Sequence, residues 1–431
     1  MQIKRDGKTA RSGDTMKKVM VILGAYYPNP SANGICVGRV VDRLLQDGYS
    51  VFCLCNSQLN APDKEDIDNL HIRRIKAKAH KKYNEMVRRS SNIIQKSFYS
   101  LLRALSDIFH VVKMTKNFPV ASMHHAKKIF KVANSILIEN DIDTVIGVNM
   151  PTDTMYAAYL LKKEHPDIDF IPYSLDPIYG GMNNKFLSKD IVNKRNCQFE
   201  RKMLEECSAF IAQHEHREHF EKCHAQFADK LRFVGVPLLV NHNDLTLPPK
   251  REKKVLLYAG ALSRETRNPA YIFEVFKHID NVKLIMYISN GEEWVKSAAK
   301  GIDNIEIHGK ISHDEVLAKM NEADAFLNIG NTQSMFCPSK IVEYISYGKP
   351  IVSTYRTDND TCGDYMSKYP LGVYLDERTE NVRDAAKKIE NVMFDNTEVL
   401  PYNQLKELYA DNTPAYVVDL IRSLHGSKKE N

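Results

Sequence analysis

The stretch "PSKIVEYISYGKPIV", residues 338–352, decides the fold, because it holds a helix start, a helix end and a strand. Pro338 and Ser339 suit the first turn of a helix, and apolar residues then recur at helical spacing. Gly348 suits a left-handed helix cap, and Pro350 prevents the helix from continuing. The run "PIVST" that follows is typical of a buried strand. We therefore predict a short helix that leads directly into a strand.

One charged residue, Glu343, stands inside this predicted helix, four residues after Ser339. That spacing places both side chains on one helix face, near the helix start. Free N–H groups at a helix start suit a phosphate, and a carboxylate one turn further on can accept two hydrogen bonds from a ribose diol. The pair can therefore hold a nucleotide. Taken alone, a solvent-exposed Glu343 is the more common situation, so that alternative stays open here.

Strand and helix patterns alternate along both halves of the chain. The predicted strands, such as "KKVMVILGAYY" and "KVLLYAG", are continuously apolar, as in a parallel sheet that helices cover on both faces. Between the halves, "PLLVNHNDLTLPPK" loses this periodicity. We predict two Rossmann-like, doubly wound α/β domains facing a cleft. The predicted boundaries are a first domain over 16–236, a linker over 237–252, a second domain over 253–400 and C-terminal helices over 401–424 that cross back.

Composition indicates an ordinary globular protein without a membrane span. The chain has 431 residues, 43% of them hydrophobic, and a net charge of +6. Its eight cysteines include no C-x-x-C pair, which fits reduced thiols in the cytosol. No uncharged apolar run reaches about eighteen residues, and residues 1–15 hold no apolar signal core. We predict a cytoplasmic protein in which residues 1–15 are a disordered extension.

Positive charge is concentrated in residues 71–131. This segment holds fifteen Lys or Arg against two acidic residues, so the rest of the chain is negative by about seven charges. Apolar residues are interleaved at helical spacing, at Ile94, Phe98, Leu101, Leu102, Leu105, Ile108, Phe109 and Val112. The pattern is typical of a basic amphipathic helix or hairpin and predicts peripheral binding to an anionic membrane. A solvated hairpin is the alternative, and nucleic-acid binding is disfavoured because aromatic platforms are few.

Two loops after predicted strands suit a phosphate ligand. In "GAYYPNPSANG", Gly34 allows backbone to approach a ligand at a helix start. In "YAGALSRETRN", Gly260 ends a strand, and Ser263, Arg264 and Arg267 follow it. Arginines offer forked donors that suit a diphosphate, although solvated surface arginines are the alternative. The chain has no G-x-G-x-x-G motif and no acidic residue after "FCLC", so NAD binding is disfavoured.

The tandem α/β halves, together with "YAGALSRETRN", "IEIHGKISHDEV", "ADAFLNIG" and "PSKIVEYISYGKPIV", resemble a GT-B glycosyltransferase of glycosyltransferase family 4. The resemblance covers roughly residues 16–424. It implies a retaining enzyme without a cofactor or metal, which moves a sugar from a nucleotide donor, a UDP-sugar in preference to a GDP-sugar. It implies a saccharide acceptor on a polyprenyl diphosphate lipid, in capsule or O-antigen assembly at the cytoplasmic membrane face.

The resemblance also implies roles for single residues. Glu343 matches the second glutamate of an E-x7-E motif and would hold the donor ribose. Arg264 and Arg267 would stabilise the departing diphosphate, and the backbone at 309–311 would read the base. The residues expected at the donor site are Gly34, Gly260, Ser263, Arg264, Arg267, Gly309, Lys310, Ile311, Ser339, Lys340 and Glu343.

Two positions depart from the family's pattern at the donor site. Met335 stands where the first glutamate of E-x7-E is expected, and methionine cannot accept hydrogen bonds from sugar hydroxyls. Ala261 stands where an arginine is expected. Arg264 is the candidate that would compensate for the missing arginine, and Gln333 or loop backbone would serve in place of the missing glutamate. These departures leave open a nucleotide-sugar-binding protein without turnover. A sugar-nucleotide 2-epimerase, which also uses tandem α/β domains, is the other alternative, although it would need acid and base groups beside the donor sugar and Met335 offers none.

On the acceptor side, "YSLDPIYGG" places Asp176 at the end of a predicted strand. Its position resembles the aspartate of a His-Asp pair in the family, with Leu175 in place of the histidine. As a catalytic group, the carboxylate would receive or orient the proton of the acceptor hydroxyl. An aspartate that closes a turn before Pro177 is an equally simple interpretation.

A last motif, "HEHREHFEKCH", gathers four histidines and Cys223 within eleven residues, 214–224. Such side chains can bind zinc, and His219 and Cys223 are at helical i, i+4 spacing. The spacing fits no closed set of four ligands within this motif. We therefore predict a polar helix surface here and no metal.

Overall fold

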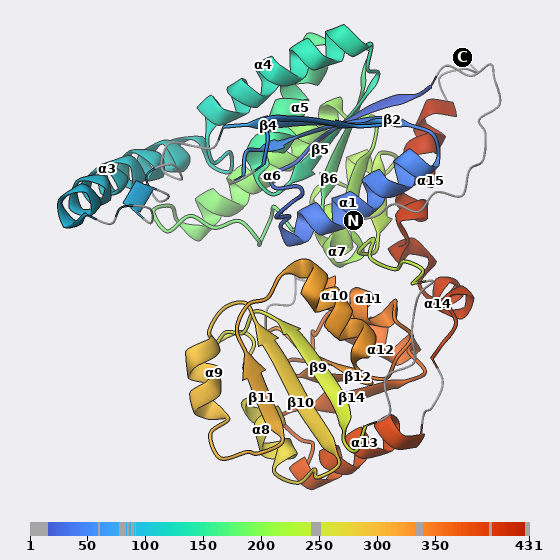
Figure 1. Cartoon of the computed structure of the whole chain (residues 1–431). Coiled ribbons are helices and arrows are strands. Elements are labelled where there is room, and N and C mark those ends of the chain that lie inside the picture. The colour runs from blue at the N-terminus through green and yellow to red at the C-terminus, as the bar shows by residue number, and fades with distance from the viewer. Residues whose placement is uncertain are drawn as a thin grey trace. The chain divides into compact units, whose positions relative to one another are not determined.

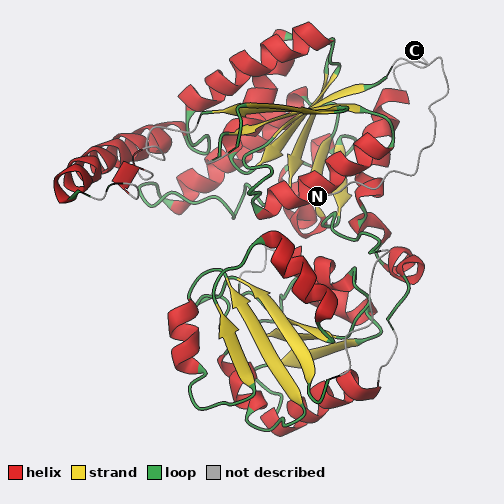
Figure 2. Ribbon diagram, viewed as in Figure 1, coloured by secondary structure: helices red, strands yellow, loops and turns green. Residues whose placement is uncertain are grey.

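The computed structural model describes residues 16–58, 61–76, 83, 86–87, 90, 92–242, 251–332, 339–395 and 399–426. The chain divides into two compact units, the first formed by residues up to Val234 together with those from Ala415 onward, the second by Gly235–Pro414. Each unit contains one twisted sheet between layers of helices (Figures 1 and 2). The prediction of two doubly wound α/β domains is confirmed.

The first unit is built on an eight-stranded sheet of order β3-β4-β2-β1-β5-β6-β7-β8. All pairs in it are parallel except β3 with β4 at one edge. Its buried strands are apolar, and a core of Val, Ile, Leu and Phe side chains fills the space beneath the helices. The strands are β1 (Lys18–Ile22), β2 (Ser50–Asn56), β3 (Lys64–Ile67), β4 (Leu70–Ile75), β5 (Thr144–Asn149), β6 (Asp169–Ser174), β7 (Phe210–Gln213) and β8 (Leu231–Val234).

Helices connect these strands, and the last helix of the chain joins the same unit. They are α1 (Ala32–Gln46), α3 (Ile93–Asn117), α4 (Met123–Asn140), α5 (Thr152–Glu164), α6 (Lys189–Glu206), α7 (Arg217–Cys223) and α15 (Pro414–Gly426). Arg422 of α15 forms an ion pair with Asp47 at the end of α1. Helix α15 therefore belongs to the first unit.

The second unit holds a wholly parallel six-stranded sheet of order β11-β10-β9-β12-β13-β14. Its strands are β9 (Lys254–Gly260), β10 (Val282–Ile288), β11 (Ile305–His308), β12 (Ala325–Ile329), β13 (Ile351–Tyr355) and β14 (Gly372–Asp376). Its helices are α8 (Ala270–Phe276), α9 (Glu292–Ala298), α10 (His313–Glu322), α11 (Ser339–Ile345), α12 (Gly363–Lys368), α13 (Val382–Asp395) and α14 (Tyr402–Leu408).

The helix and strand predicted from residues 338–352 are present as α11 and β13. Gly348 has φ +66°, and a Cβ there would lie 2.3 Å from the carbonyl oxygen of Leu400. Both facts favour glycine. Pro338 lies outside the described residues, as do Gln333, Met335, the predicted extension over 1–15 and residues 243–250 of the predicted linker.

Among the described residues of the basic segment 71–131 are most of β4, all of α3 and the start of α4, and the helix predicted for this segment is present as α3. Figure 1 shows α3 projecting from the body of the first unit. Arg195 of α6 holds the end of α3 by donating to the carbonyl oxygens of Thr115 (2.7 Å) and Lys116 (3.3 Å). Within the described ranges, no helix combines the length and apolar character needed to span a membrane.

Sequence reasoning missed that Lys349 is buried, with 1% of its surface exposed. Its Nζ donates to the carbonyl oxygens of Met320 (3.1 Å), Asn321 (2.6 Å) and Ala323 (2.8 Å), at the end of α10. These carbonyls would otherwise be unpaired at a helix C-terminus. Burial lowers the pKa of Lys349 to about 8, so the amine is still mainly protonated at neutral pH. Lys349 therefore joins the end of α10 to the turn that ends α11.

We expect Lys349→Met to lower the free energy of unfolding by about 2 to 4 kcal/mol at pH 7, because three buried carbonyls lose a charged donor. Urea unfolding measures this. The lysine's pKa is lower in the folded chain, so wild-type stability should rise between pH 8 and lysine's ordinary pKa, about 10.4, and that rise should be absent from the variant. Exposed Lys368→Met is the control, and equal stabilities of the two variants would contradict the capping role.

Candidate active site

The second unit opens at the carboxyl end of its central strands. β9 pairs with β10 along its whole length, up to Gly260, but with β12 only at Leu256 and Leu257. The strand order reverses between β9 and β12. β10 and β11, which follow β9 in the chain, lie on one side of it, whereas β12 lies on the other side. Ligands of open α/β sheets bind at such a switch point, outside the carboxyl ends of the strands.

Helix α11 is fixed at this switch point by Tyr344. The Tyr344 ring stacks on Phe326 of β12, with ring centroids 4.6 Å apart and planes 7° apart. Its hydroxyl accepts a hydrogen bond from the N–H of Ala259 (3.2 Å), beyond the part of β9 that pairs with β12. Burial raises the pKa of the Tyr344 phenol, which therefore stays neutral. One side chain thus holds the helix to both strands.

Glu343 precedes this anchor and is only 9% exposed. Its Oε2 accepts a hydrogen bond from Nζ of Lys340, one turn earlier, at 2.5 Å. The solvent-exposed alternative for Glu343 is therefore wrong. A buried carboxylate beside an ammonium group provides both an acceptor for hydroxyl groups and a cation for an anionic ligand.

Arg267 brings positive charge to the same end of the sheet. Backbone hydrogen bonds between Ser263 and Arg267, 3.0 Å in both directions, close the loop after β9. The Arg267 guanidinium interacts with the Tyr258 hydroxyl, and its charge also acts on Tyr344 and on Asp360. Its Nε is buried and has no hydrogen-bond partner among the described residues. An unpaired buried donor is costly, which favours a polar ligand at this position.

Arg264 and Ser263 play different parts from Arg267. Arg264 is exposed, and its guanidinium lies over the ring of Trp294 on α9, 5.4 Å from the ring centroid. Ser263 organises the loop, because its Oγ donates to a carboxylate oxygen of Glu265 (2.8 Å) and accepts from two loop N–H groups. Arg264 is therefore not among the residues that the structure gathers around Tyr344.

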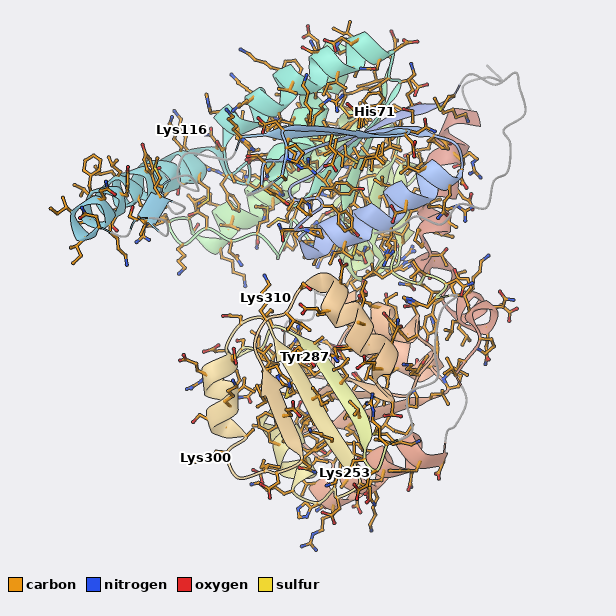
Figure 3. The ribbon with its side chains drawn as sticks, in the orientation of Figure 1. His71, Lys116, Lys253, Tyr287, Lys300 and Lys310 are labelled. Carbon is orange, nitrogen blue, oxygen red and sulfur yellow. The ribbon has the colours of Figure 1, made fainter. Side chains whose placement is uncertain are left out.

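The loop after β11 carries the residues predicted to read a base. Gly309 packs against Glu292 of α9, because a Cβ on Gly309 would lie 2.4 Å from a Glu292 carboxylate oxygen. Lys310 is exposed (Figure 3), and Ile311 is half-buried. Glu292, which pairs with Lys296 at 2.5 Å, is a neighbour of this loop that sequence reasoning missed. No motif marks it, since α9 and this loop meet only in the folded chain.

The first unit has a comparable switch point between β1 and β5. Asp176 follows β6, and its Oδ2 accepts a hydrogen bond from Asn33 Nδ2 at 2.7 Å. Asn33 Nδ2 also donates to the carbonyl oxygen of Asn149 at the end of β5 (3.2 Å), and Asn149 Nδ2 donates to the carbonyl oxygen of Asp176 (3.1 Å). Three polar residues from three separate chain segments therefore form one connected group.

Burial raises the pKa of the Asp176 carboxyl, although the hydrogen bond from Asn33 opposes that shift. A raised pKa suits a group that accepts a proton. Gly34 is explained differently from the sequence prediction. Its N–H is bonded to Ser31 Oγ (3.2 Å), and a Cβ would lie 2.0 Å from the carbonyl oxygen of Ala25. The glycine is thus required by packing within the unit, and its role toward a ligand stays a prediction.

Comparisons with known proteins agree with this geometry. Residues 253–393 match the family model described as "Glycosyl transferases group 1". No curated protein sequence matches the chain. Sucrose-phosphate synthase from Thermosynechococcus elongatus aligns with a TM-score of 0.62 at 11% identity, covering 95% of this chain and 100% of that one.

Two further structures share the fold. An E. coli structure described as trehalose-6-phosphate bound with UDP-2-fluoro glucose gives a TM-score of 0.57 at 9% identity, covering 95% of this chain and 99% of that one. UDP-N-acetylglucosamine 2-epimerase gives 0.52 at 12% identity, covering 97% and 99%. The fold is that of GT-B glycosyltransferases. The matched domain and these neighbours together support a glycosyltransferase.

We expect Asp176→Asn to raise the free energy of unfolding at pH 7. The carboxyl has a higher pKa in the folded chain than the ordinary 3.8, so its ionisation above pH 3.8 opposes folding, and Asn removes that penalty. The difference between variant and wild type should vanish below pH 3.8, where the carboxyl is protonated in both states. Urea unfolding across this pH range tests it, with exposed Asp190→Asn as the control. A variant less stable than wild type at pH 7 would contradict the burial argument.

Proposed function

We propose that this protein is a retaining glycosyltransferase of family 4, which binds a nucleotide sugar in the second unit and an acceptor hydroxyl in the first. The observation that carries the proposal is the group at the end of β9. It combines the buried Glu343, its partner Lys340 and the buried Nε of Arg267, to which no described residue hydrogen-bonds. A ribose diol matches the carboxylate, which accepts hydrogen bonds, and a diphosphate matches the guanidinium, which donates them.

In the proposed donor complex, Glu343 accepts hydrogen bonds from the ribose and Arg267 donates to the diphosphate. The loop at 309–311 reads the base. Uridine is favoured over guanosine because a neighbour of the same fold is described with UDP-2-fluoro glucose. Arg264 contacts the Trp294 ring, so we place it second to Arg267.

The proposed reaction breaks the bond between the anomeric carbon and the diphosphate oxygen and forms a bond from that carbon to the acceptor oxygen, on the same face of the sugar. The acceptor proton passes to the departing diphosphate, and Asp176 orients the acceptor hydroxyl. Positioning and stabilisation of the negative charge on the diphosphate then supply most of the rate enhancement. Arg267 and Lys340 provide that positive charge.

The 2-epimerase alternative is separated from transfer by its product. An epimerase would convert the donor into a nucleotide sugar of altered configuration without an acceptor, whereas transfer releases free nucleoside diphosphate only with one. A protein without turnover would bind the nucleotide sugar and do neither. Chromatography of a UDP-sugar after incubation, with and without a polyprenyl-diphosphate saccharide, distinguishes the three.

We expect Glu343→Ala to weaken binding of UDP or a UDP-sugar by about 1.5 to 3 kcal/mol for each hydrogen bond lost to the ribose. Isothermal titration calorimetry measures this. Exposed Glu274→Ala on α8 is the matched control and should bind as the wild type does. Equal affinity in the Glu343 variant would remove the ribose contact from the proposal.

The acceptor class is proposed from α3. Six of its apolar side chains are more than half exposed: Ile93, Ile94, Phe98, Leu101, Leu105 and Val112. Lys96, Lys113 and Lys116 on the same helix are also exposed, as are Lys127, Lys128 and Lys131 on α4. Such a helix can insert its apolar side chains between lipid headgroups while the lysines meet anionic phosphates. We propose peripheral binding at the cytoplasmic membrane face and a lipid-linked saccharide acceptor, as in capsule or O-antigen assembly.

We expect the protein to sediment with anionic phosphatidylglycerol vesicles and not with neutral phosphatidylcholine vesicles. Each lysine near the surface contributes about 1 kcal/mol, so binding should weaken as salt shortens the Debye length. The double variant Phe98→Ser, Leu101→Ser should reduce sedimentation, whereas exposed Phe394→Ser on α13 should not. Sedimentation that changes neither with salt concentration nor in the double variant would exclude α3 as the element that binds the membrane.

A further inference from the structure

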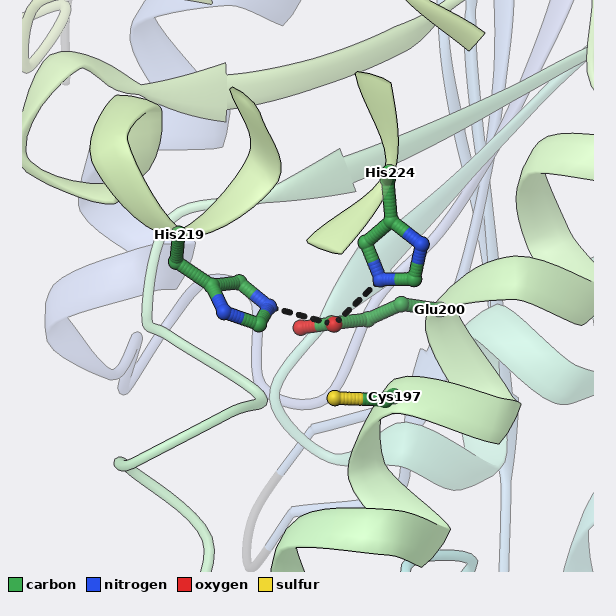
Figure 4. A group of neighbouring side chains, drawn as sticks. All are labelled: Cys197, Glu200, His219 and His224. Atoms are coloured by element: carbon green, nitrogen blue, oxygen red, sulfur yellow. Dashed lines mark hydrogen bonds and ion pairs between the residues drawn. The ribbon is translucent and has the colours of Figure 1, made fainter. Parts of the chain in front are cut away.

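Four side chains with metal-ligating atoms converge in the first unit, away from the residues assigned above (Figure 4). Cys197 and Glu200 come from α6, His219 from α7, and His224 directly follows α7. The sequence predicts a polar helix surface for these histidines, and that prediction is wrong. The side chains of Glu200 and His224 are 1% exposed and that of His219 is 9% exposed, and Phe220 of α7 packs on Phe210 of β7, with ring centroids 5.1 Å apart.

The two imidazoles point at one oxygen atom, as the dashed lines of Figure 4 show. Glu200 Oε2 lies 2.7 Å from His219 Nε2 and 3.0 Å from His224 Nε2. The Cys197 sulfur completes the group, and all four ligand atoms lie within 4.8 Å of one another. Two nitrogens, an oxygen and a sulfur, from α6, α7 and the residue that follows α7, are thus gathered together.

These side chains are held in place by their neighbours. Tyr179 stacks flat on His219, with centroids 4.1 Å apart and planes 8° apart. The backbone N–H of Tyr179 donates to the other Glu200 oxygen, Oε1, at 3.1 Å. Glu200 Oε2 is therefore left to the histidines, and the His219 ring cannot rotate freely. Such outer contacts orient the ligands in metal sites.

We propose that Cys197, Glu200, His219 and His224 bind one Zn²⁺ ion in a closed, structural site. The ligand types suit zinc, which takes cysteine sulfur, histidine nitrogen and carboxylate oxygen in tetrahedral geometry. His219 and His224 are separated by four residues, within the usual spacing of histidine pairs in zinc sites. Cys197 and Glu200 are three residues apart on a helix, which places both on one face.

Charge balance also favours a cation. Glu200 is buried, and among the described residues neither a lysine nor an arginine hydrogen-bonds to it. A Zn²⁺ ion with one carboxylate and one thiolate gives a neutral buried group. Ligand atoms in a tetrahedral zinc site lie about 3.3 to 3.8 Å apart, so binding needs the side chains to shift from their present separations, which start at 2.7 Å and stay within 4.8 Å.

The site would stabilise the segment that carries Asp176. Tyr179, which contacts both Glu200 and His219, is three residues beyond Asp176 on the same loop. The thiol of Cys223 also interacts with that of Cys197. Cys223 is therefore the side chain that competes for Cys197, and oxidation of the pair to a disulfide would remove the sulfur ligand.

The test is the metal content of the full chain, purified under reducing conditions from zinc-supplemented cells after removal of any affinity tag. Elemental analysis should find about one zinc ion per chain. Removing it with a chelator should lower the melting temperature, and adding Zn²⁺ should restore it. Replacement by Co²⁺ should give a thiolate-to-cobalt charge-transfer band. Less than a tenth of an ion per chain, together with a melting temperature that neither chelator nor zinc changes, would overturn the site.

Variants separate the metal site from a hydrogen-bonded cluster of Glu200 with two histidines. Cys197→Ala should lose the zinc and the cobalt band, although it leaves both Glu200–histidine hydrogen bonds in place. Cys207→Ala, directly after the same helix, is the matched control. It should keep both the zinc and the cobalt band, since the Cys207 thiol donates to the Leu204 carbonyl oxygen. Should Cys197→Ala not fold, cobalt titration of the wild-type chain decides. Full zinc retention in a folded Cys197→Ala variant would remove Cys197 from the ligand set.

Discussion

The hydrogen bond from the Ala259 N–H to the Tyr344 hydroxyl is the contact on which the proposed donor site depends. β9 and β12 separate after Leu257, so the backbone of β9 beyond that point loses its partner on one edge. A buried N–H without a partner is unfavourable, and Tyr344 supplies the acceptor while its ring packs on Phe326. The position of α11, and with it that of Glu343, follows from this one requirement.

The same requirement appears in the first unit with different side chains. Asn33 and Asn149 pair with Asp176 at the carboxyl ends of β5 and β6. In both units, buried or half-buried polar side chains lie at the carboxyl ends of the strands. Burial raises the pKa of Asp176, so the fold carries a cost there that packing alone does not explain. Residues retained at such a cost are the ones to associate with chemistry.

Local patterns in the sequence predicted helices and strands well. They did not predict contacts between segments that are distant in the sequence. Helix α11, the left-handed Gly348 and strand β13 follow from neighbouring residues, so the sequence was sufficient. The burial of Lys349 was not predictable, because its three carbonyl partners belong to α10, earlier in the chain. For the same reason Glu292 was missed beside Gly309.

The histidine motif failed in an instructive way. Within 214–224 the spacing suggested no complete ligand set, because Cys197 and Glu200 stand on α6, before strand β7. Only the folded chain brings the two pairs together, through the hydrogen bonds of His219 and His224 with Glu200. The helical spacing of Cys197 and Glu200 was visible in the sequence, but a single such pair is common and specifies nothing until a second pair faces it.

The loop after β6 connects the two parts of the first unit that bear on function. At its start, the Asp176 carbonyl oxygen accepts hydrogen bonds from Asn149 and from Ser174 Oγ (2.8 Å). Three residues later, Tyr179 is held by Glu200 and His219. A short segment fixed at both ends has few conformations. The conformational entropy of placing the Asp176 carboxylate is then lost during folding and not during binding of the acceptor. The group formed by Cys197, Glu200, His219 and His224 is therefore linked to the proposed acceptor site through this loop. By fixing Tyr179, the group helps to position the Asp176 carboxylate.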